Sequence, residues 1–176
     1  MKKVKVATLW LDGCSGCHMS LLDSDAAVIA LAGRIDLVYG PLVDAQEFPE
    51  GVDVTLVEGA VSSLEDMHRI EAVRHRTHLL VALGDCAVTS NVPAMRNSVP
   101  VNQLLQRVYV EGADENKQIP SDGVPVLMKH ARPLHEFVEV DIHVPGCPPP
   151  AKAILGLLTD LLEGRKPAAN PKVKFG

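Results

Sequence analysis

Residues 4–18 read VKVATLWLDGCSGCH, an apolar and partly β-branched run that passes into a glycine-rich turn with two cysteines. Val4 to Leu11 is typical of a buried strand. After Cys17, apolar residues recur at helical spacing as far as Leu31 and predict a helix. A strand, a tight turn and a helix in this order form the first half of a βαβ unit, so a parallel sheet is expected.

The alternation of strand and helix signals continues along the rest of the chain. Further strands are expected at residues 35–39, 52–57, 78–83 and 137–144, and helices at 64–76, 101–109 and 151–162. Ser62 and Glu65 have the spacing of a capping box at the start of the helix expected at 64–76. The pattern predicts a single flavodoxin-like α/β domain at residues 1–164, followed by an extended tail at 165–176. Its sheet is doubly wound and mostly parallel, with helices on both faces.

Composition and charge exclude several classes of protein. The chain has 176 residues, of which 47% are hydrophobic, and this is enough for one folded core. A net charge of −5 argues against nucleic acid as a partner. No apolar run reaches the roughly 18 residues of a membrane span, and the N-terminus lacks the pattern of an export signal. We therefore expect a cytoplasmic protein without membrane attachment, in a compartment where structural disulfides are rare.

The four cysteines of the chain, Cys14, Cys17, Cys86 and Cys147, each follow a predicted strand in a turn rich in glycine or proline. The strands that precede them are the first, the fourth and the fifth. Ligands of such sheets bind beyond the carboxyl ends of the strands, so the four thiols are expected to converge. Four converging thiolates suit an iron–sulfur cluster or a tetrahedral zinc ion.

Residue spacing alone leaves other interpretations open. Zinc sites usually combine two CxxC pairs, whereas here the third and fourth cysteines are single and distant. A dithiol oxidoreductase would need only Cys14 and Cys17. Cys86 alone would suit a buried structural thiol. The small residues beside the cysteines favour an iron–sulfur cluster, because they let backbone N–H groups approach its sulfur atoms.

Four segments resemble the small subunit of nickel–iron hydrogenases, and most of all the cytoplasmic NAD-reducing (bidirectional) type. They are WLDGCSGCHMS at residues 10–20, EGAV at 58–61, GDCA at 84–87 and VPGCPP at 144–149. The resemblance extends from residue 4 to about residue 162. It implies one proximal 4Fe–4S cluster held by Cys14, Cys17, Cys86 and Cys147, and no catalytic residue on this chain.

The resemblance also implies partners. The nickel–iron site would lie on a separate large subunit. Electrons from hydrogen would pass through the cluster to diaphorase subunits with further iron–sulfur clusters and FMN, and then to NAD. With four cysteines the chain is expected to hold one cluster. The alternatives are the small subunit of another soluble hydrogenase, a complex-I-like oxidoreductase or a structural zinc module. Subunits of the complex-I type carry an adjacent Cys–Cys pair, which is absent at Cys14-Ser15-Gly16-Cys17.

Two other residues and two segments have open roles. Glu58, at the end of a predicted strand, is either a proton-relay or interface carboxylate, or a residue that caps a loop or forms an ion pair. His18 is expected to contact the surroundings of the cluster rather than to ligate it. Residues 91–112 and 118–133 are candidate contact surfaces for a partner subunit. Flavin binding is not expected, because the cysteine turn replaces a flavodoxin phosphate loop.

Overall fold

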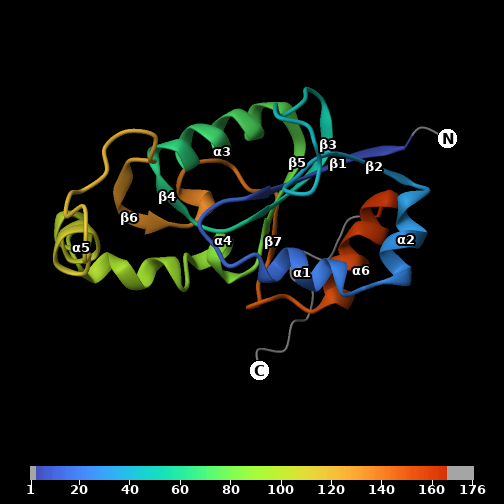
Figure 1. Cartoon of the computed structure of the whole chain (residues 1–176). Helices are drawn as coiled ribbons and strands as arrows, with labels where there is room; N and C mark the ends of the chain where they lie inside the picture. The colour runs from blue at the N-terminus through green and yellow to red at the C-terminus, as the bar shows by residue number, and fades with distance from the viewer. Residues whose placement is uncertain (1–2, 166–176) are drawn as a thin grey trace.

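A parallel sheet of five strands runs through the centre of the computed structural model, which describes residues 3–165 (Figure 1). The strands lie in the order β2-β1-β3-β5-β7, and every pairing is parallel. Their bounds are β1 Val4–Trp10, β2 Ile35–Tyr39, β3 Val52–Glu58, β5 Thr77–Leu83 and β7 Ile142–Val144. Counted along the sheet-forming strands alone, this is the 2-1-3-4-5 order of flavodoxin-like folds, so the predicted fold class is confirmed.

Helices cover both faces of this sheet (Figure 1). On one face, Leu56 and Val81 pack with Ile154. The helices on this side are α1 (Gly16–Leu22), α2 (Ala26–Ala32) and α6 (Ala151–Leu162). On the other face, Leu80 packs with Ile70 of α3 (Leu64–Arg76), beside α4 (Asp85–Thr89). Burial on both faces explains why the central strands are nearly continuous apolar runs rather than alternating ones.

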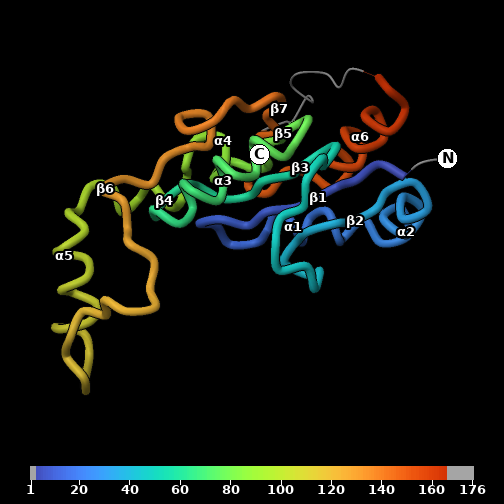
Figure 2. The backbone as a smooth tube through the Cα atoms, turned by 90° about the horizontal axis from the view of Figure 1, so that it is seen from above, coloured from blue at the N-terminus to red at the C-terminus, as the bar shows by residue number. Residues whose placement is uncertain are grey.

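A second, two-stranded antiparallel sheet joins β4 (Val61–Ser63) to β6 (Leu127–Arg132). With η1 (Pro93–Ser98), α5 (Val101–Gln106) and the π-helical turn η2 (Arg107–Glu111) it forms an arm that projects from the main sheet (Figure 2). The Asn97 side chain pairs with both backbone groups of Ala131, at 2.9 and 2.8 Å. These bonds fix η1 along β6.

Two expected elements are wrong in their extent. The helix expected from Cys17 to Leu31 is divided into α1 and α2, because Asp25 adopts a φ of 44°, outside the helical region. Of the strand expected at residues 137–144, only Ile142–Val144 joins the sheet. The preceding residues form the short helix η3 (Leu134–Glu136) and a loop whose apolar side chains pack against the core.

The helices α3 and α6 match their expected ranges, 64–76 and 151–162. The capping box of α3 is shifted by one residue, because Ser63 and Asp66 form it rather than Ser62 and Glu65. Among the helices of residues 3–165, none is long and apolar enough to cross a membrane. The expected extended tail lies, apart from Arg165, outside the described residues, and the boundary at residue 164 stays a prediction.

Candidate metal centre

All four cysteines are free thiols in segments that follow the carboxyl ends of three strands. Cys14 and Cys17 follow β1, in the turn before α1 and in the first turn of α1. Cys86 lies in α4, directly after β5, and Cys147 lies between β7 and α6. Cys17 is buried, Cys86 is half-buried, and the other two are exposed. The sequence-derived placement of the four thiols after these strands thus agrees with the structure, while their role as ligands stays a prediction.

Glycine backbone lies against two of the thiols. A Cβ atom on Gly84 would overlap the Sγ atom of Cys17, and one on Gly16 would lie 3.2 Å from the Sγ atom of Cys14. Gly84 also has a φ of 84° and a ψ of 163°, a conformation available to almost no other residue. The absence of a side chain at these positions leaves room for the sulfur atoms and for backbone close to them.

The thiols also influence one another electrostatically. Burial raises the pKa of Cys17, and the negative charges of Glu58 and of the other three cysteines raise it further. Burial is also the largest cause of the raised pKa of Cys86. The charges on Cys147 and Cys14 add to the effect, whereas a hydrogen bond from the N–H of Val92 opposes it. A cationic centre between the thiolates would remove this mutual destabilisation, because metal binding displaces the thiol protons.

The described residues contain no ready-made site for a single metal ion. Across residues 3–165, no three or more His, Cys, Asp and Glu side chains are grouped closely enough to hold one metal ion.

Reciprocal hydrogen bonds join the Cys86 and Cys147 segments. The N–H of Asp85 donates to the carbonyl of Gly146 at 2.8 Å, and the N–H of Gly146 donates to Oδ1 of Asp85 at 2.6 Å. The N–H of Gly84 donates to the carbonyl of Val144, also at 2.8 Å. The Asp85 carboxylate therefore organises a turn that connects two segments distant in sequence.

Similar contacts hold the first cysteine turn. Asp12 and Ala60 exchange backbone hydrogen bonds of 3.1 and 2.8 Å, which join the Cys14 segment to the end of β3. The hydroxyl of Ser20, in α1, donates to the carbonyl of Pro149 at 2.6 Å. Ser20 could not be predicted from the sequence, because its partner Pro149 lies 129 residues away and no local pattern marks it. The three cysteine-bearing segments thus form one connected unit.

Glu58 ends β3 with its side chain pointing at the start of α1. It is 1% exposed, and it accepts hydrogen bonds from the N–H groups of Cys17 at 3.4 Å and of His18 at 3.0 Å. Its Oε2 atom lies 2.5 Å from Nδ1 of His18. Burial raises the pKa of Glu58, but the bonds and charge of His18 and the N–H of Cys17 outweigh burial and lower it. Glu58 is therefore a carboxylate at a helix N-terminus, where negative charge is favourable.

The chain is similar to known proteins over most of its length. The sequence profile of a family described as NADH ubiquinone oxidoreductase, 20 Kd subunit, matches residues 14–161. The chain is 38% identical over 168 residues to the delta subunit of the NAD-reducing hydrogenase HoxS of Cupriavidus necator, covering 93% of this chain and 80% of that protein. It is also 38% identical over 172 residues to a subunit of the F420-non-reducing hydrogenase vhu of Methanocaldococcus jannaschii, covering 97% of this chain.

The two kinds of relative differ in how much of them is matched. The chain spans 60% of the length of the Methanocaldococcus protein. A solved structure of an NAD+-reducing NiFe hydrogenase in the H2-reduced state is similar over 95% of both chains. That structure superposes with a TM-score of 0.90 at 40% sequence identity.

Proposed function

We propose that this chain, which belongs to the family described as NADH ubiquinone oxidoreductase, 20 Kd subunit, is the electron-transferring small subunit of a nickel–iron hydrogenase. The similarity to an NAD-reducing hydrogenase subunit and to a solved NAD+-reducing NiFe hydrogenase supports this function. The observation that carries the proposal is the position of the four free thiols, which all follow the carboxyl ends of strands of the main sheet.

Cys14, Cys17, Cys86 and Cys147 would hold one 4Fe–4S cluster. The donor set fits, since four thiolates complete the coordination of such a cluster, and Gly16 and Gly84 leave space beside two of the sulfur atoms. When bound, the cluster supplies transfer of one electron at a time. The burial of Cys17 keeps water from that thiol, and the Asp85–Gly146 bonds hold the last two ligands at a constant separation.

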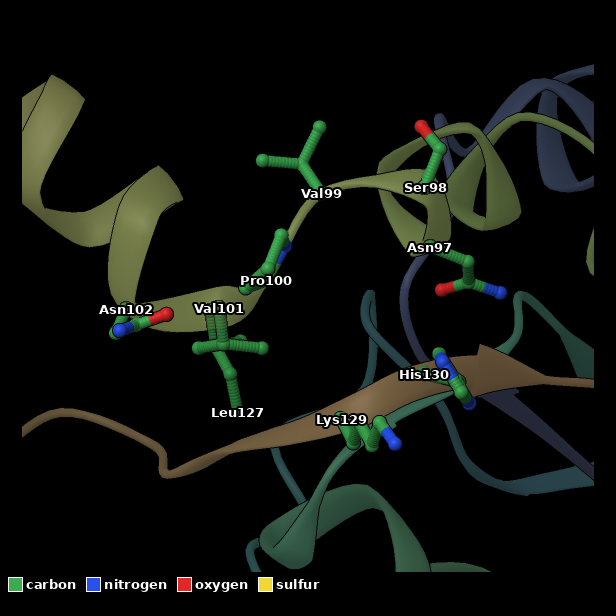
Figure 3. Close-up of a pocket in the computed structure, with 9 residues that line it drawn as sticks. All are labelled: Asn97, Ser98, Val99, Pro100, Val101, Asn102, Leu127, Lys129 and His130. Atoms are coloured by element: carbon green, nitrogen blue, oxygen red, sulfur yellow. The ribbon is translucent and has the colours of Figure 1, made fainter.

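The partner of the chain would be a large subunit with the nickel–iron site. The arm supports such an interface, because the two segments singled out in the sequence lie side by side there (Figure 2). Residues 97–102 line a cavity of about 410 Å³ together with Leu127, Lys129 and His130 of β6 (Figure 3). Exposed apolar side chains such as Met95 (76%) are suited to an obligate contact.

The electron acceptor would be NAD, reached through diaphorase subunits with iron–sulfur clusters and FMN. This choice rests on the 40% identity to the solved NAD+-reducing enzyme. The F420-non-reducing relative, at 38% identity, makes another acceptor the alternative. The cytoplasmic location expected from the sequence belongs to the same proposal.

The proposal is tested by measuring iron and acid-labile sulfide per chain, on protein purified and reconstituted without air. We expect about four of each per chain. Zinc without sulfide would overturn the electron-transfer function and leave a structural site. Within the complex, Cys147→Ser is expected to abolish hydrogen-dependent NAD+ reduction, whereas the control Glu71→Gln, at an exposed position of α3, leaves its rate unchanged. Unaltered reduction in the Cys147 variant would contradict the ligand assignment.

A further inference from the structure

Residues 101–110, which form α5 and most of η2, have a broad apolar face that the core does not cover. The apolar side chains of this stretch are Val101, Leu104, Leu105, Val108, Tyr109 and Val110. None of them is fully buried, and Val108 and Tyr109 are 58% and 40% exposed. The apolar face of a helix is normally packed against other parts of a protein. Here it lies on the arm that projects from the main sheet (Figure 2).

A groove of about 490 Å³ lies along this face, between the helical residues and the segment of residues 120–127 that returns to β6. On the helical side it is lined by Val101, Leu105 and Tyr109, which are four residues apart and therefore form one ridge. On the other side Pro120 and residues 124–127 line it, and all of these are aliphatic or proline. The groove is thus apolar along both walls.

The wall formed by the returning segment is held in place by the rest of the chain. The N–H of Leu64, at the start of α3, donates to the carbonyl of Val126 at 3.0 Å. Pro120 and Pro125 restrict the φ angle of the backbone in the same wall. The groove is therefore formed before any partner arrives, and this lowers the cost of ordering the chain when a partner binds.

The rim of the groove is acidic. Residues 111–122, which connect η2 to the returning segment, contain four carboxylates and one lysine. Glu111 pairs with Arg107 at 3.1 Å. The other three carboxylates are exposed and have no ion-pair partner within residues 3–165: Asp114, Glu115 and Asp122. Lysine or arginine beside an apolar surface matches this rim, whereas nucleic acid or a second copy of the chain, with its net charge of −5, does not.

We propose that the groove between α5 and residues 120–127 binds an amphipathic helix of a partner protein, with apolar side chains on its inner face and lysine or arginine on its outer face. A helix suits the groove because the ridge of Val101, Leu105 and Tyr109 can pack between the side-chain ridges of a second helix. Tyrosine is also enriched at the centre of protein interfaces. No cysteine lines the groove, so its test is independent of the cluster and of the hydrogenase function.

The experiment measures the binding of two fluorescent peptides to the full chain, by anisotropy at low salt. One peptide contains two copies of Leu-Lys-Lys-Leu-Leu-Lys-Leu, a sequence with leucine on one helical face, and in the other peptide every lysine is replaced by glutamate. We expect the lysine peptide to bind at one site and at least about tenfold more tightly than the glutamate peptide, because exposed charges act strongly at low ionic strength. Equal affinities would overturn the charge match, and absence of binding would overturn the docking site.

Two aspartate variants locate the bound peptide. Val126→Asp places a charge in the apolar wall and is expected to weaken binding of the lysine peptide at least about fivefold, although the new charge attracts lysine. The matched control Leu42→Asp adds the same charge in the turn after β2, outside the groove, and is expected to leave binding unchanged or to strengthen it. The two side chains are 63% and 80% exposed, so both variants should fold, which circular dichroism checks.

Equal weakening in the Val126 and Leu42 variants, or full binding in the Val126 variant, would overturn the location of the site. Self-association of the chain that Val126→Asp abolishes would assign the groove to a second copy and would likewise overturn the proposal.

Discussion

Gly84→Ala is the sharpest test of the geometry around the thiols. The backbone at residue 84 has φ 84° and ψ 163°, and holding alanine there costs about 1–3 kcal/mol. The new methyl group would overlap the Sγ atom of Cys17 and lie 3.4 Å from the carbonyl oxygen of Gly146. Overpacking of this kind adds about 1–3 kcal/mol. The free energy of unfolding is therefore expected to fall by about 2–6 kcal/mol, a large part of the stability of a typical domain.

The assay is urea unfolding of the metal-free chain, followed by far-ultraviolet circular dichroism. Gly156→Ala is the matched control, because a Cβ at this position in α6 has no heavy atom within 4 Å. Alanine in a helix is favoured over glycine by about 0.5–1 kcal/mol, so the control is expected to unfold at a higher urea concentration. A Gly84→Ala chain as stable as the wild type would refute the placement of Cys17 against residue 84.

Three further changes have expected outcomes. Ser63→Ala removes the N-cap of α3 and should lower the unfolding free energy, measured by calorimetry, by about 1 kcal/mol. Glu65→Ala should leave the unfolding free energy nearly unchanged. Equal effects of the two changes would contradict the observed capping box. The pKa of Glu58 is lowered from 4.5, so its stabilisation is present above pH 4.5 and is lost as the pH falls below it. Acid unfolding of Glu58→Gln should therefore depend less on pH in this range, and an identical profile would count against the carboxylate. Ile70→Ala should lower the unfolding free energy by about 2–5 kcal/mol in urea, while an effect below about 1 kcal/mol would show that Ile70 is not part of the core.

The main sheet could be predicted from the sequence because its strands carry their own signal. The runs around Val54 and Leu80 are apolar on both faces, and each is separated from the next strand by helix-forming residues. The same reasoning failed for residues 137–144. There Phe137 and Val138 belong to a run that alternates as a strand would, but they pack as a loop against the core. Burial produces the same apolar pattern in both cases, and only the pairing partner distinguishes them.

The smaller features depend on contacts between distant segments, which no local pattern contains. β4 has three residues and exists because β6, far along the chain, pairs with it. The partner of Glu58 was likewise not predicted. The sequence left open whether Glu58 caps a loop or forms an ion pair and named no residue for that pair, and the structure pairs Glu58 with His18 of the same chain. The cysteines could be singled out because thiols in glycine- or proline-rich turns are typical of metal ligands. Ser20 could not be singled out, because serine hydroxyls are common throughout proteins.

The positions of the cysteines along the chain have a consequence for biogenesis. The first two follow the opening strand, and the last follows β7, which lies at the edge of the sheet and is the final strand in sequence. The Cys147 segment joins the Cys86 segment only when this edge strand has docked and the Asp85–Gly146 bonds have formed. A truncated or misfolded chain therefore cannot present a full set of donors. Under the proposed function, cofactor loading would act as a quality check that only completed subunits pass.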